Sequence, residues 1–207
     1  MEDISRNVIS MLEKIESLKR QYKDNCLLRK NGTLLLDPKK DLKYKHMLFK
    51  PLSISILQQY LINQYKVPIP QSYVNFLLFT NGANLFNIRL VDGKYAFAVI
   101  NLCIYGVPMT PPYARAKNME EPYDVRIEGL ARHKDIPSQW FKVGSYYKNC
   151  DFDTIYNLFI DVNDERVYGC EKNKNIIIDE WNNFDECLCS IFDSFSDLKE
   201  EYIYSKD

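Results

Sequence analysis

Residues 68–82 of this chain, PIPQSYVNFLLFTNG, predict a short amphipathic helix with a defined start and end. Pro70 suits the first turn of a helix, because its fixed φ is already helical and it has no N–H to leave unpaired. At the other end Asn81-Gly82 predicts a helix stop, since both residues tolerate left-handed backbone geometry. The face expected to be buried, at helical spacing, consists of Tyr73, Phe76, Leu77 and Thr80. Taken alone, the segment indicates a capped core helix without chemistry.

Two further helical patterns precede this segment. The first 22 residues place apolar side chains three or four positions apart, which predicts a long amphipathic helix. Its apolar stripe is Ile4, Val8, Met11, Leu12, Ile15, Leu18 and Tyr22. Residues 54–65 predict a shorter helix of the same kind, which leads into the opening segment.

Between these helices, residues 26–36 (CLLRKNGTLLL) predict a small hairpin, because Asn31-Gly32 separates two apolar runs. Residues 37–50 contain five lysines diluted by two aspartates, without an array of stacking aromatics. We interpret them as a solvated linker and expect no direct binding of nucleic acid. The expected organisation is an N-terminal helix and lysine-rich connector over residues 1–50, followed by one compact domain over residues 51–207.

The compact domain is predicted to be α+β with a mainly antiparallel sheet flanked by helices. A strong hairpin signal comes from FNIRLV and KYAFAVINL, joined at Asp92-Gly93. WFKVG, TIYNLFIDV and RVYGC predict three more strands, and residues 176–178 a further one. An apolar stripe from Phe184 to Phe195 predicts a closing helix. The proline-rich residues 105–135 cannot form a long helix, and we expect an insertion or a partner-facing loop there.

Composition excludes several classes of protein. Charged residues at 27 % and hydrophobic residues at 46 % are ordinary for a globular protein. No apolar run approaches the roughly 20 residues that cross a bilayer, and the N-terminus is unlike a signal peptide, so we expect a cytoplasmic protein without membrane contact. The six cysteines form no Cys-x-x-Cys pair and are expected to be free thiols. His46 and His133 lie beside lysines, and exposed imidazoles without a role are expected, with no metal and no cofactor.

Charge is distributed unevenly along the chain. Residues 150–207 hold 5 Lys and Arg against 15 Asp and Glu, a balance of −10, although the whole chain has a net charge of −1. Three interpretations stay open: an internal match between acidic and basic segments, an acidic face for a basic partner, or a solvated acidic helix.

The order of these motifs resembles the SUKH superfamily, which includes the fungal Smi/Knr regulators and many bacterial immunity proteins. The resemblance covers roughly residues 52–196 and departs from the family pattern where Ala83 replaces a second glycine after Asn81. The matching positions, expected to be structural, are Ile69, Pro70, Tyr73, Phe76, Asn81, Gly82, Gly144, Asp161, Val167, Tyr168 and Trp181.

The sequence lacks several common enzyme motifs. The chain has no Gly-x-Ser-x-Gly, no phosphate-binding glycine loop and no cysteine beside a histidine. Asp151 and Asp153 lie near Asp161 and Asp164, which would suit a paired-carboxylate or divalent-metal site. The spacing is too loose for a calcium loop, and a polar loop between strands is the preferred interpretation. We therefore expect a protein that is not an enzyme.

The resemblance implies an immunity protein that neutralises a cognate toxin by stoichiometric binding, the toxin being expected from a neighbouring gene. Nucleases are among the toxins such proteins bind, and an acidic surface would steer a basic partner. A regulatory scaffold of the Smi/Knr type and an enzyme with an unrecognised site are the alternatives. The candidate partner-binding residues are Tyr113, Tyr123, Tyr146, Tyr147, Asp151 and Asp153. For the tyrosines, packing against the sheet edge is the competing interpretation.

Overall fold

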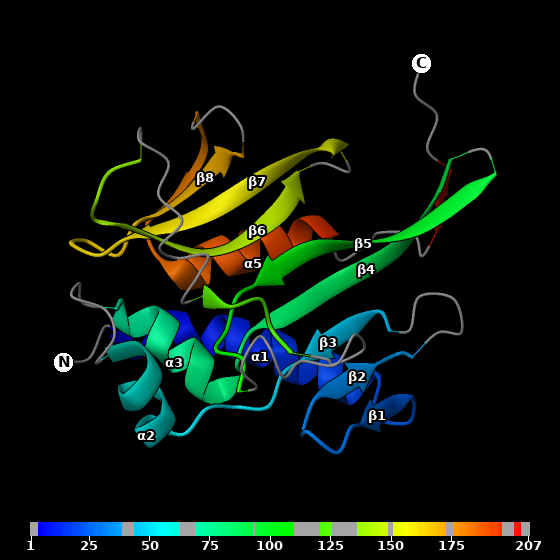
Figure 1. Ribbon diagram of the computed structural model, residues 1–207, viewed down its shortest axis with the longest axis horizontal. Helices are drawn as coiled ribbons and strands as arrows, with labels where there is room; N and C mark the ends of the chain where they lie inside the picture. The colour runs from blue at the N-terminus through cyan, green and yellow to red at the C-terminus, as the bar shows by residue number, and fades with distance from the viewer. Residues whose placement is uncertain are drawn as a thin grey trace.

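The chain folds into an antiparallel sheet with helices packed against it, as a computed structural model shows (Figure 1). The structure describes residues 4–38, 44–62, 69–92, 94–109, 121–125, 136–148, 151–172, 176–195 and 201–203. The helices are α1 (Ile4–Gln21), α2 (Ile54–Leu57), the π-helical η1 (Gln58–Ile62), α3 (Gln71–Phe79) and α5 (Phe184–Phe195). The predicted α+β class is confirmed.

Nine strands of the described residues follow one another in the sheet in chain order, each antiparallel to the next. They are β1 (Cys26–Leu28), β2 (Leu34–Leu36), β3 (His46–Leu48), β4 (Ala83–Asp92), β5 (Tyr95–Ile104), β6 (Trp140–Lys148), β7 (Asp151–Asp161), β8 (Val167–Glu171) and β9 (Ile177–Trp181). The predicted hairpins at 26–36 and 86–102 and the later strands are confirmed. A tenth strand, β10 (Glu201–Ile203), pairs in parallel with Arg89–Val91 of β4.

Helix α3 buries its aromatic face as predicted. Tyr73 and Phe76 are almost fully buried, and both rings meet Phe184 of α5 edge to face, with centroids 5.6 and 5.7 Å apart. The end of the helix differs from the prediction, because α3 stops at Phe79 and Thr80 is already extended. Gly82 has a φ of +87° but follows two residues later, where a Cβ atom would come within 2.8 Å of the Ile104 carbonyl oxygen. The glycine therefore allows close strand contact and does not cap the helix.

The start of α3 is capped by a residue distant in sequence. Pro70 precedes the helix and makes no side-chain capping bond. Instead, the carboxylate of Glu165 accepts hydrogen bonds from the backbone N–H groups of Gln71 at 3.0 Å and Ser72 at 3.4 Å. A carboxylate in this position satisfies N–H groups that a helix leaves unpaired and interacts favourably with the helix dipole.

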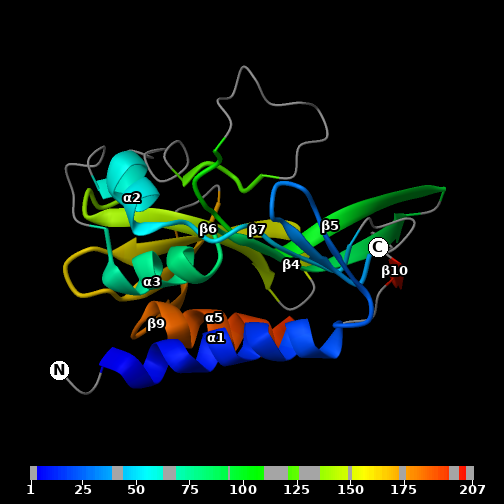
Figure 2. The same cartoon turned by 90° about the horizontal axis from the view of Figure 1, so that it is seen from below.

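The N-terminal helix forms part of the core. Met11, Ile15 and Leu18 are buried, and α1 lies beside α5 beneath the sheet (Figure 2). The backbone N–H of Met11 donates to Asp185 at 2.9 Å, and Lys14 forms an ion pair with Asp193 at 2.6 Å. The acidic last segment and the basic first segment are thus matched in charge at Lys14 and Asp193.

The interpretation of residues 37–50 as a solvated linker is wrong for residues 44–49. His46–Leu48 form β3, which joins β2 to β4, and a small apolar cluster consists of Leu35, Tyr44, Met47 and Phe49. The strand is buried on both faces, with Met47 in this cluster and Leu48 in the main core, so the sequence shows no alternation that would have indicated it. The pairing of β3 with β4 connects the first fifty residues to the rest of the sheet.

His46 was expected to be exposed and is instead 1 % exposed. Its Nδ1 accepts a hydrogen bond from the Phe86 N–H at 3.2 Å, and burial, with a smaller effect of Lys45, lowers the pKa of His46 to about 3. Phe86 has a φ of +55°, which is strained for a bulky residue, and β4 and β5 skip one pair at this point. His133 lies outside the described residues.

Candidate functional site

A hollow forms where two neighbouring hairpins of the sheet separate. Strands β5 and β6 pair only from Leu102 to Ile104, opposite Gly144 to Tyr146. Beyond these pairs the β4–β5 hairpin continues away from β6 and β7 (Figure 1). The space between them is a hollow of about 470 Å³, a size within the range of small-molecule sites.

Gly144 makes the short junction possible. A Cβ atom at this position would come within 2.5 Å of the Cys103 carbonyl oxygen, so a side chain would force the two strands apart. The register of β6 against β7 also shifts between Lys142 and Gly144. The glycine that the resemblance marks as structural therefore permits the close contact of β5 and β6 beside the hollow.

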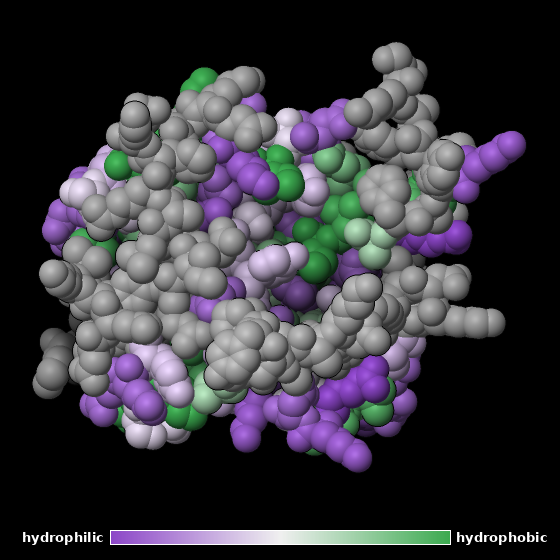
Figure 3. Space-filling view, in the orientation of Figure 1, coloured by the Kyte–Doolittle hydropathy of each residue, from purple (hydrophilic) through white to green (hydrophobic). Residues whose placement is uncertain are grey.

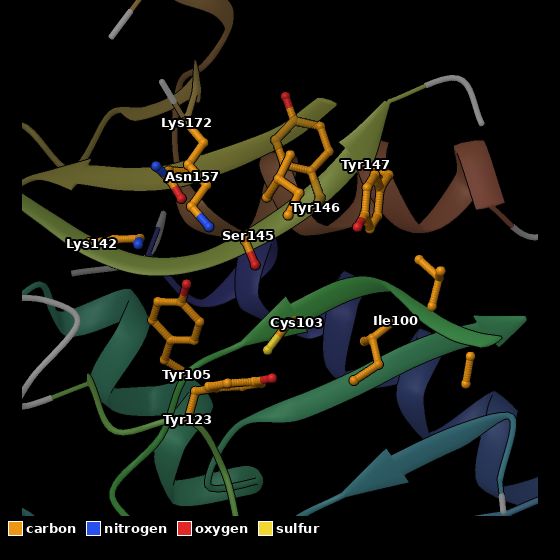
Figure 4. A pocket seen from close by; sticks show the side chains of 13 residues that line it. Ile100, Cys103, Tyr105, Tyr123, Lys142, Ser145, Tyr146, Tyr147, Asn157 and Lys172 are labelled. Carbon is orange, nitrogen blue, oxygen red and sulfur yellow. The ribbon is translucent and has the colours of Figure 1, made fainter. Parts of the chain in front are cut away.

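The lining combines aromatic, neutral polar and basic side chains from segments far apart in sequence (Figure 4). Hydrophilic and hydrophobic residues meet near the middle of the face that Figure 3 displays. The described lining residues are Ala98, Val99, Ile100, Cys103, Tyr105, Tyr123, Lys142, Ser145, Tyr146, Tyr147, Ile155, Asn157 and Lys172.

A lysine and a tyrosine face each other across one end of the hollow. The ammonium of Lys142 lies 5.4 Å from the centre of the Tyr105 ring, within the range of a cation–π contact. Lys142 is only 9 % exposed, although it lines the hollow together with Tyr105. The Tyr105 ring in turn lies 6.0 Å from that of Tyr123.

Two of the candidate tyrosines line this hollow with part of their side chains accessible. Tyr123 is 55 % exposed, and Tyr147 is half-buried on β6. The pKa of Tyr147 is raised by burial and, to a smaller extent, by the nearby Tyr123. The structure thus brings together two residues that are 24 positions apart, which no local pattern could have indicated.

Tyr146 also borders the hollow, but the structure buries almost all of its side chain. Its side chain is 3 % exposed, and its hydroxyl donates to Asp179 at 2.5 Å. Burial, followed by the contact with Asp179, raises the pKa of Tyr146 well above its usual value. The same carboxylate also accepts from Lys148 at 2.5 Å. Tyr146 is a core residue because strand alternation turns it away from the face of Tyr147.

The remaining candidates lie away from the hollow or outside the described residues. Asp151 and Asp153 are exposed at the start of β7, where Asp151 accepts from the Asp153 N–H at 3.0 Å. Asp161 is buried on the same strand and accepts from the Trp140 indole at 3.1 Å. These carboxylates therefore do not form one paired site. Tyr113 lies outside the described residues.

Most residues that the resemblance marks as structural pack in the interior, whereas Ile69 and Tyr168 are only partly buried. Tyr73 is in ring contact with Phe141 as well as Phe184, and Val167 pairs with Trp181 across β8 and β9. Asn81 holds the segment after β5 in place, since its side chain donates to the Val107 carbonyl and accepts from the Val107 N–H, both at 2.7 Å. Asn81 thus braces a loop that contributes Tyr105 to the hollow.

Several lining residues were not singled out from the sequence. Lys142, Ser145 and Asn157 interrupt strands that are otherwise rich in apolar residues. A polar side chain at such a position is a usable signal, because it must find a polar environment inside the fold. Lys172 and Tyr105 follow strand ends and leave no comparable signal.

Comparisons with known proteins identify no relative of this chain. No family model, no curated protein and no solved structure matches this chain. Within the described ranges, no helix is both long and apolar enough to cross a bilayer. No group of three or more potential metal-ligating side chains occurs among the residues described.

Proposed function

We propose that this chain is a SUKH-like protein-binding domain of the immunity type, which neutralises a cognate bacterial toxin by forming a stoichiometric complex. The observation that carries the proposal is the convergence of Tyr123 and Tyr147 at one hollow on the sheet. Accessible aromatic side chains around a recess are typical of the residues that dominate the energy of protein interfaces.

The arrangement of the matched motifs supports the part of the proposal that concerns a SUKH-like fold. Helix α3, the strand with Gly144, the strand ending in Asp161 and the strand with Val167-Tyr168 follow in the order that the resemblance implies. Their apolar residues share one core with Trp181 and α5. With most of the motif residues inside, other residues form the surface that a partner would contact.

The distribution of acids changes which surface we propose for the partner. Many carboxylates of the last segment are engaged within the chain: Asp179 with Lys148, Glu180 with Arg166, Asp193 with Lys14 and Glu165 with α3. An acid that is already paired steers a basic partner less effectively than a free one. We therefore place the proposed interface at the rim of the hollow, around Tyr123 and Tyr147.

Co-purification of this chain with the product of the adjacent gene tests the function. We expect a one-to-one complex by size-exclusion chromatography with light scattering, and rescue of cells that express the toxin. Tyr123→Ala should weaken the complex by about tenfold or more, as truncation of an interface aromatic usually does.

Leu28→Ala is the matched control, because Leu28 is 68 % exposed on β1, an edge strand of the sheet that does not line the hollow. It should leave the affinity unchanged. A neighbouring toxin that neither binds the chain nor loses its toxicity would contradict the proposed function, and equal weakening by both variants would contradict the proposed surface.

A further inference from the structure

We propose that the hollow between the two hairpins is a binding site for a small aromatic anion, a planar ring that carries a carboxylate or a phosphate. The inference concerns a small molecule and does not depend on the proposed toxin partner. It rests on the charge of the lining, on the placement of its rings and on the size of the cavity.

The charge of the lining favours an anion. Among the described residues that line the hollow, the charged side chains are Lys142 and Lys172, and neither Asp nor Glu occurs. The two lysines come from different strands, since Lys142 belongs to β6 and Lys172 follows β8. Two ammonium groups along one recess create a positive potential that a low-dielectric wall strengthens.

The rings favour a planar group beside that anion. Tyr105 is buried at 5 % exposure, so its position is determined by the fold, and its carbonyl accepts a hydrogen bond from Tyr73 at 2.8 Å. Tyr123 lies beside it and is half-exposed, with an angle of 53° between the ring planes. A planar ligand placed against an accessible ring gains stacking energy at little cost in side-chain entropy.

Neutral polar groups complete the lining. Ser145 and Asn157 are directly opposite each other on β6 and β7, and both side chains line the hollow (Figure 4). Asn157 is 2 % exposed, so its orientation is constrained. A hydroxyl and an amide supply donors and acceptors that orient a ligand without changing the charge of the site.

Titration of the isolated chain with two aromatic anions tests the inference. The probes are adenosine 5′-monophosphate and benzoate, each compared with its neutral counterpart, adenosine or benzyl alcohol, and with inorganic phosphate. Calorimetry and NMR chemical shifts should show that at least one aromatic anion binds more tightly than its neutral counterpart and than phosphate. The anion that binds identifies phosphate or carboxylate as the preferred group.

Two exposed positions make the test specific to the hollow. Lys172→Gln should weaken binding by about fivefold, the upper end for an exposed charge pair, and Tyr123→Ala by about tenfold, as for loss of a stacked ring. Lys30→Gln is the matched control, an exposed lysine between β1 and β2. It should bind as the unaltered chain does.

Three results would overturn the inference: neither aromatic anion binds more tightly than phosphate, the neutral counterparts bind equally well, or both variants at the hollow retain full affinity. Because these titrations contain no partner protein, their failure leaves the proposed toxin complex to its own experiment.

Discussion

His46 is held neutral in the fold, since its buried ring accepts a hydrogen bond from the Phe86 N–H through Nδ1. Protonation would remove that acceptor and place a charge in the core. Its pKa is about 3 in the fold against 6.5 in an unfolded chain. Between these values the unfolded state binds more protons, so the free energy of unfolding decreases as the pH falls below 6.5.

The expected contribution of His46 to this decrease is about 1.4 kcal/mol per pH unit at most. Urea unfolding at pH 7 and pH 5 measures it. His46→Asn is the control, because an amide oxygen can accept from the Phe86 N–H without titrating. The variant should lose less stability between the two pH values, and an identical loss in both proteins would contradict the assignment.

The stability of the fold also depends on Gly169, which lies close to the side chain of Tyr146. A Cβ atom there would come within 2.4 Å of the Tyr146 hydroxyl and 3.3 Å of the Asp179 Cβ. The Tyr146 ring cannot easily move, because it is packed between Tyr156 and Trp181. Gly169→Ala should therefore destabilise the fold by about 1–3 kcal/mol, the usual cost of overpacking, as chemical unfolding would show.

Tyr146→Phe, which removes the hydroxyl near Gly169, provides the control for the Gly169→Ala variant. In a Tyr146→Phe background the added methyl group meets less obstruction, so the same Gly169→Ala change should cost less. Equal costs in both backgrounds would show that the Tyr146 hydroxyl is not the obstacle.

At the scale of elements, α3 depends on the turn between β7 and β8. Glu165 in that turn caps the N-terminus of the helix, although its own φ of +60° is unfavourable for a residue with a side chain. Glu165→Ala should destabilise the protein by about 0.5–2 kcal/mol, as the loss of a helix cap does. Glu165→Gln retains an acceptor and should cost less.

Asn163→Ala serves as the control for this cap, since Asn163 is exposed in the same turn. It should change the midpoint of thermal unfolding less than Glu165→Ala does. If the two variants shift the midpoint equally, the turn as a whole and not the carboxylate supports the helix.

Elements with strong local patterns were predictable, and those determined by distant contacts were not. The stripes in α1 and α5 and the turn-flanked apolar runs of β1, β2 and β6 to β8 contain their own signals. In contrast, β3 is a three-residue strand within a lysine-rich segment, and it is specified by its neighbours β2 and β4. Helix α3 ends earlier than predicted. At its end the Thr80 hydroxyl donates a hydrogen bond to the Phe49 carbonyl at 3.0 Å, a partner 31 residues away in the sequence.

The hollow was predictable only in part, for the same reason. Tyr123 and Tyr147 were selected as aromatic residues in or near irregular segments, whereas Tyr146 satisfied the same criterion and is buried. Neighbouring residues of a strand point to opposite faces, so the register decides which tyrosine is accessible. That register depends on the pairing of Leu102 with Tyr146, which involves two distant strands.

For the whole molecule, the structure predicts that residues 51–207 do not fold by themselves. Strand β3 pairs with β4, and α1 buries Met11 and Ile15 in the same core as α3 and α5. Removal of residues 1–50 would expose this apolar surface and leave one edge of β4 without β3. Near-ultraviolet circular dichroism of the shortened chain should lack the signal of fixed aromatic side chains.

The full chain is the control, and it should show that signal and one cooperative unfolding transition. A shortened chain with a native-like spectrum and a sharp transition would mean that the first fifty residues are a separable extension.

The position of β4 also affects how the protein is made. Its first residues pair with β3, and its outer residues Arg89–Val91 pair with β10 at the other end of the chain. During synthesis on the ribosome, the outer half of β4 lacks this second neighbour until residue 203 has left the exit tunnel. The nascent chain must therefore carry a strand with an unpaired edge for more than a hundred residues of elongation, a period in which chaperones that shield such edges have their greatest effect.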